Sequence, residues 1–588
     1  MILQALTSLY EALAQKGEIS KEGWSREKIS FALGIDENGD LLRITPLFET
    51  VDMPKGKKKE EPQKMTVPAA VKRTSGAAAN FLWDNSSYIL GVSLKKGEDD
   101  AEREKRRNKD IKCFEACREL HHSMLDGMEY PAAKAVLNFL DKWEPQKAEE
   151  NNLVAQYAKE ILSGANMVFR FNGGYVHDDP QLASVWQKAN AKQKDNIGQC
   201  LVTGALDEIQ KTHPTIKGVQ GAQSSGAALV SFNASAFCSY NKEQNQNAPV
   251  GKYAAFAYTT ALNHLLADRK NVHRIGDAAI VCWAENADKQ YEDFAAEVFF
   301  GDNVDKSDEQ RLSALRTSLK LLADGLPCKE MDLDPDRKFY ILGLSPNAAR
   351  IAVRFFYCDS FGKIAGNIYK HHERLEIVRP SYDKFPILPL WKLLSATVNP
   401  NAKDKTPNAA MAGAVARAVF SGGRYPASLL ECTFLRIKAE RNITRERAAI
   451  IKAYYLRNPN EKCPKEVLTV SLNENSKNIP YTLGRLFSVY EEIQQAANPG
   501  INTTIKDRYF GSAAAMPATV FPILSNLAQK HLRKLSDAQR VYLDKKVMTL
   551  KSVLGEQYPA HMSLPEQGSF DLGYYHQTQA RYTKKEDK

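Results

Sequence analysis

One segment that could bind a nucleotide is Gly221–Ala227, GAQSSGA. Its two glycines, Gly221 and Gly226, have the separation found in a P-loop, whose backbone amides cradle phosphates. A P-loop also needs a lysine that reaches the phosphates and a hydroxyl that holds magnesium. Ala227 and Ala228 stand at those two positions. The sequence therefore predicts no nucleotide hydrolysis here.

The segment YVHDD, Tyr175–Asp179, points to a second class of chemistry, metal-dependent phosphate-ester hydrolysis. His177 and Asp178 form the dipeptide that such enzymes use, but two metal ions need further His and Asp ligands, and we cannot assemble them. The pairs His121–His122 and His371–His372 are adjacent, so their members face different sides of a helix and chelate poorly; we predict exposed polar positions. We expect no catalytic site, metal or cofactor, and a nuclease built on His177 and Asp178 is the alternative.

Amide, hydroxyl and glycine residues are concentrated in the segment Ile216–Tyr253, and a shorter segment, Val71–Asn85, has a similar composition. Small residues let the backbone approach a ligand closely, and Asn and Gln side chains both donate and accept hydrogen bonds. Such groups suit base edges and sugar-phosphate oxygens, especially in the narrow minor groove. Ordinary turn and cap chemistry is the alternative explanation.

Basic residues recur along helical, aromatic-containing sequence from Arg436 onward, as in FLRIKAERNITRERAAIIKAYYLRNP. The chain carries 80 Lys and Arg against 70 Asp and Glu, a formal charge of +10. Cations beside Tyr454, Tyr455, Tyr509 and Phe510 suit a groove that follows phosphates and stacks bases. Solvated helix faces over core aromatics would give the same pattern.

The elements that must position these residues change along the chain. ISFALGI and LLRITPL flank Asn38-Gly39, a strong hairpin signal. Pro54–Lys64 is predicted to be a mobile loop, and Lys95–Lys109 a solvated linker or an exposed helix start. Further strand candidates are NMVFRFNGG, ALVSFNASAF and AAIVCWAE; KFYILGLSPNAARIAVRFFY is either a hairpin or a helix with Arg350 and Arg354 on its face.

From about residue 400 the apolar spacing becomes helical, with boundaries marked by Asn-Pro and Ile-Pro pairs. We predict an α+β fold: a mixed α/β domain with short strands and hairpins over 1–395, an all-α bundle over 406–575, and a frayed tail over 576–588. The mixed domain is expected to recognise a ligand motif and assemble a complex.

Composition places the chain among soluble globular proteins: 43% of its 588 residues are hydrophobic and 26% charged. No apolar run approaches the length of a membrane span. The N-terminal sequence MILQALTSLYEALA has helical spacing rather than the features of a signal peptide. Nine cysteines occur without paired spacings, which favours a reducing compartment. We predict a cytoplasmic protein without a membrane partner.

Several long segments resemble the type I-C CRISPR Cascade large subunit of the Csd type. They are MILQALTSLYEALA, RTSGAAANFLWDNSSYILG, GAALVSFNASAFCSYNKEQNQNAPV, GDAAIVCWAE, SPNAARIAVRFFY and GRYPASLLECTFLRIKAERNITRERAAIIKAYYLR. The resemblance covers nearly the whole chain in the same order.

This resemblance implies a non-catalytic subunit of a surveillance complex built on a CRISPR RNA. Such a subunit recognises the protospacer-adjacent motif (PAM) in target double-stranded DNA, aids unwinding and R-loop formation, stabilises the displaced strand and recruits a helicase-nuclease. Its other implied partners are the Cascade backbone and small subunits, and the C-terminal bundle is expected to resemble a small subunit. A scaffold that binds only proteins is a further alternative.

The resemblance also suggests roles for residues. Lys72, Arg73 and the Lys55–Lys59 cluster would hold the flanking duplex by its phosphates, and Phe81 or Trp83 would be a wedge that unstacks the first target pair, unless they belong to the core. The groove-reading residues are predicted to be among Asn80, Asn85, Gln220, Gln223, Ser224, Ser225, Asn241, Gln244, Asn245 and Asn247. The candidates for the displaced strand are Arg436, Lys438, Arg441, Arg445, Arg447, Lys452, Arg457, Lys506 and Arg508, some of which would instead pair with Glu440, Glu446 and Asp507.

Overall fold

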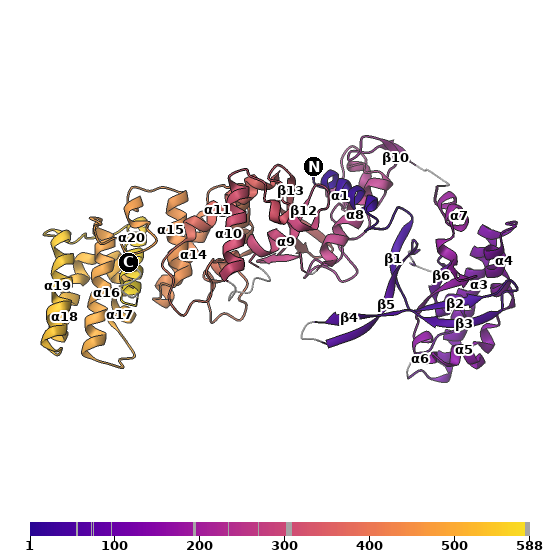
Figure 1. Ribbon diagram of the computed structural model, residues 1–588, viewed down its shortest axis with the longest axis horizontal. Coiled ribbons are helices and arrows are strands. Elements are labelled where there is room, and N and C mark those ends of the chain that lie inside the picture. Colours follow the sequence, from indigo (N-terminus) through magenta and orange to yellow (C-terminus); the bar gives the residue numbers. More distant parts are fainter. Residues whose placement is uncertain are drawn as a thin grey trace. The chain divides into compact units, whose positions relative to one another are not determined.

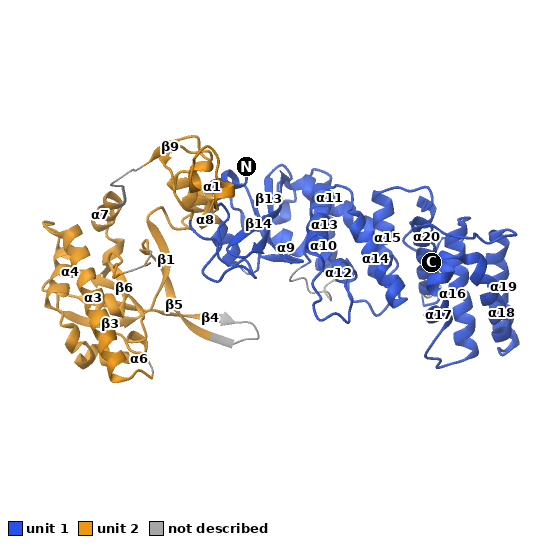
Figure 2. Ribbon diagram, turned by 180° about the vertical axis from the view of Figure 1, so that it is seen from behind, with its two compact units in different colours: residues 1–9, 214–231, 262–588 blue, residues 10–213, 232–261 orange. Residues whose placement is uncertain are grey.

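The computed structural model (Figure 1) describes residues 1–53, 57–71, 73, 76–95, 97–191, 196–232, 234–268, 270–301 and 309–582. The chain divides into two compact units (Figure 2). Unit 1 comprises residues 1–9, 214–231 and 262–588, and unit 2 comprises residues 10–213 and 232–261. Helices α1 (Ile2–Gln15) and α8 (Lys252–Ala267) are each divided between the units. Among the described residues, no helix is long and apolar enough to cross a membrane.

Unit 2 is built around a sheet with strand order β3-β2-β7-β6, to which β8 adds beside β7. Its strands are β2 (Phe31–Ile35), β3 (Leu41–Pro46), β6 (Trp83–Asn85), β7 (Asn166–Phe171) and β8 (Gly174–Tyr175). Every residue of β2 is buried. Leu33 and Phe169 point into a core that includes buried residues of α3 (Asp100–Leu125) and α4 (Pro131–Lys142). Helices therefore cover one face of this sheet.

The predicted hairpin at Asn38-Gly39 is confirmed, because β2 and β3 pair antiparallel across it. Asp36 stabilises the turn: its carboxylate accepts the N–H groups of Asn38 (2.9 Å) and Asp40 (2.8 Å). Gly39 has φ of +82°, and a Cβ there would lie 2.3 Å from the Phe139 backbone nitrogen. The glycine is required both by the turn and by the packing of α4 against it.

A second sheet of unit 2 has the order β1-β5-β4, from β1 (Trp24–Ile29), β4 (Phe48–Met53) and β5 (Lys57–Pro68). The loop predicted over Pro54–Lys64 is therefore wrong for residues 57–64, which belong to β5; residues 54–56 lie outside the described residues. Ion pairs stabilise the polar strand β5, because Glu61 binds Lys28 of β1 at 2.6 Å and Lys59 at 3.0 Å. The remaining elements of unit 2 are α2 (Ser86–Ile89), α5 (Asn152–Ala155), α6 (Ala158–Ile161), α7 (Pro180–Ala191), β9 (Ile197–Gln199) and β10 (Leu206–Glu208).

Unit 1 contains an antiparallel sheet of order β11-β12-β13-β14. Its strands are β11 (His273–Ile275), β12 (Ala278–Ala284), β13 (Lys338–Asn347) and β14 (Arg350–Ser360). The pairing of β13 with β14 confirms the hairpin and excludes the helical alternative for this segment. The strand expected at ALVSFNASAF does not form; within the described residues of that segment, Ala228 makes one isolated bridge to Arg350. AAIVCWAE and NMVFRFNGG do form strands, β12 and β7.

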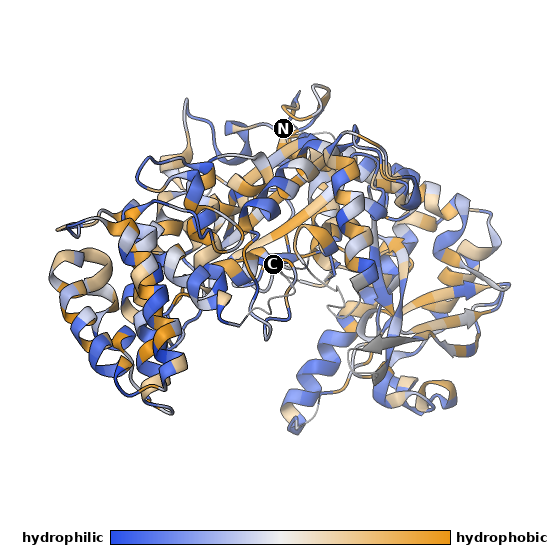
Figure 3. Ribbon diagram, turned by 60° about the vertical axis from the view of Figure 1, so that its left-hand side comes forward, coloured by the Kyte–Doolittle hydropathy of each residue, from blue (hydrophilic) through white to orange (hydrophobic). Residues whose placement is uncertain are grey.

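The rest of unit 1 is helical. Its helices are α9 (Lys289–Val298), α10 (Glu309–Ala323), α11 (Phe361–Leu375), α12 (Leu390–Ser395), α13 (Ala409–Ser421), α14 (Ala427–Glu440), α15 (Arg445–Arg457), α16 (Ile479–Ala497), α17 (Ile505–Ala515), α18 (Pro517–Leu532), α19 (Asp537–Leu554) and α20 (Leu564–Ala580). These helices carry both hydrophobic and hydrophilic residues (Figure 3). The side chains of Asn408, Thr444, Asn478 and Thr504 accept backbone N–H groups at helix starts, as capping residues do.

The architecture confirms the α+β prediction, with strands in the first part of the chain and a C-terminal helical region. The boundary expected between 395 and 406 does not separate two cores. One hydrophobic core runs from Ile275 and Phe339 of the sheet to Phe487 and Tyr575 of the last helices. The tail expected over 576–588 also begins later, because α20 continues to Ala580 and buries His576.

Candidate nucleic-acid interface

Loop 216–227 of unit 1 contains four of the predicted groove-reading residues, and hydrogen bonds join its two ends. The Ile216 N–H donates to the Ala227 carbonyl at 2.8 Å, and the Ala227 N–H donates back at 2.9 Å. From α8, the Asn263 side chain accepts the Lys217 N–H at 2.8 Å and donates to the Thr215 carbonyl at 3.1 Å. These bonds fix both ends of the loop.

The same loop packs against the turn of the β13–β14 hairpin. Ala228 donates to the Ala349 carbonyl and accepts from the Ile351 N–H, both at 3.0 Å. Gly221 has φ of +85°, and a Cβ there would meet Pro346 at 3.1 Å. Close backbone approach, rather than phosphate binding, explains this glycine.

The side chains of Gln220, Gln223, Ser224 and Ser225 are exposed on this loop. Within the part of the chain that the structure describes, none of the four side chains makes a hydrogen bond to another group. Their donors and acceptors are therefore available to a ligand, while the base of the loop is held by the protein. This is the arrangement that readout of a duplex edge requires.

The other half of the amide-rich segment lies in unit 2 and divides between exposed and structural residues. Asn241 and Gln244 are exposed. Asn245 is buried, and its amide binds the Gln210 carbonyl at 2.8 Å and His213 Nε2 at 2.6 Å. Asn247 accepts the Ser239 N–H and donates to two backbone carbonyls, each at 2.9 Å. Asn245 and Asn247 thus hold the turn, and their groups are not offered to a groove.

Arg73, Asn80 and Asn85 of the Val71–Asn85 segment make internal contacts; Lys72 lies outside the described residues. Arg73 forms an ion pair with Asp84 and lies 4.0 Å from the centre of the Tyr88 ring. Asn80 is buried and accepts the Val71 N–H at 2.9 Å. Asn85 caps α2 by accepting the Ser87 N–H at 3.1 Å. All three stabilise this segment locally, although 29% of the Arg73 side chain is still exposed.

The two wedge candidates are both in the core of unit 2. Phe81 is 0% exposed and stacks on His121 and Trp186, with ring centroids 5.4 and 5.7 Å away. Trp83 is 4% exposed, and its indole N–H donates to the Pro68 carbonyl at 2.7 Å. A wedge at either position would require this packing to open, so the wedge role stays a prediction that the burial does not favour.

Three of the nine cations predicted to bind a displaced strand are buried. Arg445 and Arg447 are buried: Arg445 binds Asp383 at 3.0 Å, and Arg447 binds Glu440 at 2.6 Å. Lys452 is buried too, donating to the Arg374 carbonyl at 3.0 Å, and burial lowers its pKa to about 8. These three groups are bonded within the protein, which does not favour their predicted role in strand binding.

The other six differ in exposure. Arg436 lies 3.7 Å from Glu440, Arg457 donates to the Gly423 carbonyl at 2.8 Å, and Lys506 donates to Asn442 at 3.3 Å. The exposed cations are Lys438, Arg441 and Arg508. Only these last three of the nine present their charge freely to solvent.

The histidine of the alternative enzyme site is buried. His177 is 1% exposed and lies 3.6 Å from Asp178, and burial lowers its pKa. Across the described ranges, no group of three or more His, Cys, Asp and Glu side chains is arranged to hold a metal ion. The histidine pairs were also predicted wrongly as exposed, because His121 and His371 are buried.

A cationic stripe on α3 was not singled out from the sequence. Lys105, Lys109 and Lys112 are exposed at i, i+4 and i+7 and therefore share one helix face. The segment Lys95–Lys109 was predicted to be a linker or a helix start, and the spacing of these lysines was the signal that could have identified the stripe.

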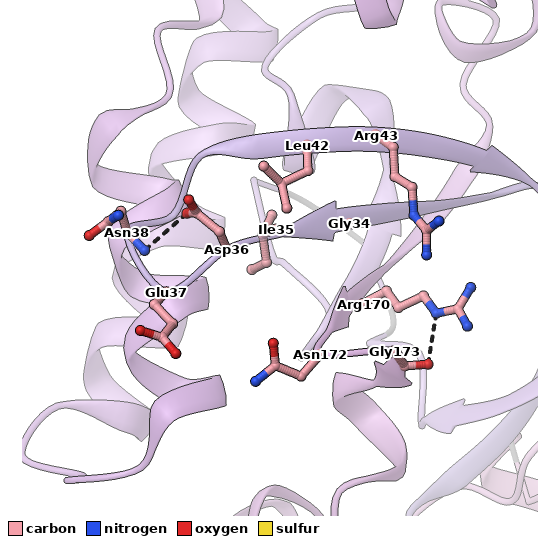
Figure 4. Close-up of a pocket in the computed structure, with 10 residues that line it drawn as sticks. All are labelled: Gly34, Ile35, Asp36, Glu37, Asn38, Leu42, Arg43, Arg170, Asn172 and Gly173. Atoms are coloured by element: carbon pink, nitrogen blue, oxygen red, sulfur yellow. Dashed lines mark hydrogen bonds between the residues drawn. The ribbon is translucent and has the colours of Figure 1, made fainter.

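A pocket on the open face of the unit 2 sheet was also missed (Figure 4). Gly34 of β2 pairs with Arg43 of β3 on one side and with Arg170 of β7 on the other. We call the resulting cavity of about 560 Å³ the arginine pocket; its lining residues are Gly34, Ile35, Asp36, Glu37, Asn38, Leu42, Arg43, Arg170, Asn172 and Gly173. An arginine within each of two mostly apolar strand sequences, LLRITP and NMVFRF, was the available signal.

Comparison with known families gives one match over nearly the whole chain. A family model described as CRISPR-associated protein (Cas_Csd1) matches residues 6–582. This match confirms the resemblance drawn from the sequence motifs. No curated protein matches the chain.

Proposed function

The chain belongs to the Cas_Csd1 family of CRISPR-associated proteins, and from that premise we propose that it is the large subunit of a type I-C RNA-guided surveillance complex. The observation that carries this proposal is the family match over residues 6–582. In such a complex a CRISPR RNA reads the target by base pairing, while protein reads a short flanking motif. The chain acts by binding and not by catalysis.

The flanking-motif function is best supported at loop 216–227. Its exposed side chains, Gln220, Gln223, Ser224 and Ser225, can donate and accept hydrogen bonds, and its base is fixed by backbone bonds. A pre-organised loop loses little conformational entropy on binding. It reads the motif in the duplex groove, and this contact begins unwinding and R-loop formation.

Electrostatic binding of nucleic acid is assigned to exposed cations. In the helical region these are Lys438, Arg441 and Arg508, which follow the displaced strand, and on α3 the cationic stripe contacts phosphates. The proposed protein partners are the backbone and small subunits and a helicase-nuclease, and the proposed location is the cytoplasm.

The test uses the complex reconstituted with guide RNA and a target library in which the flanking base pairs are randomised. We expect the wild-type complex to select particular flanks. A variant with Gln220→Ala, Gln223→Ala, Ser224→Ala and Ser225→Ala should lose about tenfold or more of that selectivity, since each lost base contact costs about 1–3 kcal/mol. The matched control replaces the exposed amides Gln146→Ala and Asn152→Ala and should leave selectivity unchanged.

Two results would contradict the proposal in different ways. If the wild-type complex shows no preference among flanking sequences, the proposed function is wrong. If the loop variant is as selective as the wild type, loop 216–227 does not read the flanking motif. Metal-dependent DNA cleavage by the purified chain, lost in His177→Ala, would favour the nuclease alternative.

A further inference from the structure

The arginine pocket places two guanidinium groups on one face of a sheet. Residues that pair across neighbouring strands direct their side chains to the same face, and strands are about 4.8 Å apart. Arg43 and Arg170 are each paired with Gly34, so their backbones lie about 10 Å apart with only a glycine between them. The opposite face is core, where Leu33 and Phe169 are fully buried.

The same face is covered at one end and open at the other. Ala32 and Val168, two residues along from the pocket, pack with Ile29, Val67 and Trp83 in a small core beneath the β1-β5-β4 sheet. Gly34 is buried as well, because the Arg43 side chain lies beside it: a Cβ at Gly34 would stand 3.0 Å from the Arg43 Cγ. The glycine therefore leaves room for the Arg43 side chain, and both residues line the cavity.

The two arginines are held differently. Arg170 donates its Nε hydrogen to the Gly173 carbonyl at 2.9 Å, and its guanidinium lies 5.5 Å from the centre of the Tyr175 ring. The Arg170 side chain extends away from Asn172, on the same side of the pocket as Arg43 (Figure 4). Arg43 makes no hydrogen bond or ion pair within the described residues. Both guanidinium groups therefore retain N–H donors, and arginine side chains bind phosphate oxygens through such donors.

The end of the pocket away from the arginines is lined by acidic and amide side chains. Glu37, Asn38 and Asn172 line it and are exposed, and they lie away from the two guanidinium groups (Figure 4). A carboxylate accepts hydrogen bonds from hydroxyl and amino groups, and an amide both donates and accepts. An anion at one end joined to hydroxyl or amino groups at the other matches a nucleotide, with its phosphate at the arginines.

We propose, on the basis of the proposed function, that the arginine pocket receives one unpaired nucleotide of a single nucleic-acid strand. Arg43 and Arg170 bind its phosphate, Gly34 forms the floor, and Glu37 and Asn172 contact the sugar or the base edge. A paired base cannot enter, because a nucleotide must leave its stack to fill a concave site. The pocket thus distinguishes a single strand from a duplex.

The test measures binding of the full-length chain to fluorescent 12-nucleotide probes: single-stranded RNA, single-stranded DNA of the same sequence, and the DNA duplex. We expect Arg43→Ala with Arg170→Ala to weaken single-strand binding at least tenfold and to change duplex binding less than twofold. Gly34→Val keeps both charges but displaces the Arg43 side chain, whose Cγ lies 3.0 Å from where a Cβ would stand, and it should weaken single-strand binding similarly. Thermal unfolding of each variant checks that it is folded.

The matched control removes the same charge from exposed positions of unit 2, Lys159→Ala with Lys188→Ala, and should change single-strand binding less than twofold. A loss confined to the RNA probe assigns the nucleotide to RNA, and a loss confined to the DNA probe assigns it to DNA. Single-strand binding that is unchanged in the double arginine variant, or lost equally in the control, overturns the proposal. That failure would leave flank selection by the complex intact, so it is distinct from failure of the proposed function.

Discussion

Cationic side chains in the helical region fall into two groups that differ in their contacts. Arg447 is 4% exposed and bonds to Glu440 and to the carbonyls of Ala396 and Asn442. Lys438 and Arg508 are exposed, and their charge is available to a ligand. Sequence spacing alone does not distinguish these groups, because both follow the same helical period.

Replacing Arg447 with alanine should therefore destabilise the protein, while Lys438→Ala should not. Removing one partner of a buried ion pair costs about 3 kcal/mol or more, whereas an exposed substitution usually changes stability by less than about 0.5 kcal/mol. Urea unfolding of the two variants measures this difference. Similar unfolding midpoints would show that Arg447 is not a structural group.

His121 gives the fold a defined dependence on pH. Its Nε2 accepts the Leu82 N–H at 2.9 Å and its Nδ1–H donates to the Cys117 carbonyl at 2.7 Å, so only the neutral ring satisfies both bonds. Burial lowers its pKa to about 4. Between pH 6.5 and 4 the unfolded chain binds a proton that the folded chain does not, so stability falls as the pH falls through this window.

We expect His121 alone to account for roughly 3 kcal/mol of that loss over the full window. His121→Gln should be less stable at pH 7 and should lose less stability on acidification than the wild type. Unfolding free energies at pH 7 and pH 5 measure both effects. An identical pH dependence in the variant would exclude His121 as a source.

Amide and hydroxyl side chains that were assigned one role from the sequence differ in their contacts in the structure. Gln220, Gln223, Ser224 and Ser225 were predicted for readout, and they are exposed and unpaired among the described residues. Asn245 and Asn247 have the same side-chain chemistry but bond to distant parts of the chain. The partner of an amide is decided by tertiary contacts, which composition does not report.

Among the secondary-structure elements, local signals were reliable and long-range pairing was not. The Asn38-Gly39 turn identifies its hairpin because the turn residues themselves require that geometry. Strand β5 was missed because its lysines, glutamates and proline are typical of loops, and its stability comes from β1 and β4 on either side. Charge pairs such as Lys28 with Glu61 become visible only once that register is known.

The crossing of α16 and α20 depends on two glycines. A Cβ at Gly484 would lie 1.9 Å from the Phe570 carbonyl oxygen, and a Cβ at Gly573 would lie 2.1 Å from the Tyr481 carbonyl oxygen. Both distances are shorter than any contact between non-bonded atoms, so no side chain fits at either position. The two helices therefore pack backbone against backbone. Neither glycine was identified from the sequence.

Gly484→Ala should therefore destabilise the protein by about 3 kcal/mol or more, since the buried helices must separate. Gly511→Ala is the matched control: it lies in α17, and its Cβ would meet nothing within 4 Å. That change should raise stability by up to about 1 kcal/mol, because alanine favours a helix over glycine. Thermal unfolding distinguishes the two, and equal shifts would contradict the close crossing.

Across the whole molecule, we propose that a neutral loop makes the sequence-specific contacts and that exposed cations bind nucleic acid non-specifically. The formal charge of +10 is too small to specify a nucleic-acid partner by itself. The proposal of a nucleic-acid partner rests on membership of a CRISPR-associated family, and the described surface offers residues that could bind it. The alternative of a purely protein-binding scaffold predicts no dependence of target binding on either surface.

Salt dependence measures the cationic contribution. Lys438→Ala, Arg441→Asn and Arg508→Ala together should reduce the slope of log affinity against log salt by about 2 for a target with a displaced strand, since each phosphate contact contributes about 0.7. Asparagine is chosen at position 441 because that backbone has φ of 52°. Lys159→Ala, Lys188→Ala and Lys211→Ala remove equal charge and should leave the slope unchanged. An unaltered slope in the first variant would remove these cations from the strand path.

The most direct measurement of the central claim is photocrosslinking from loop 216–227 in the guide-loaded complex. A photoreactive phenylalanine analogue replaces Gln223, and the target DNA carries labels in its flanking base pairs and in its guide-paired segment. We expect crosslinks to the flanking base pairs, and only when target DNA is present. Crosslinks confined to partner proteins or to the guide-paired segment would contradict it.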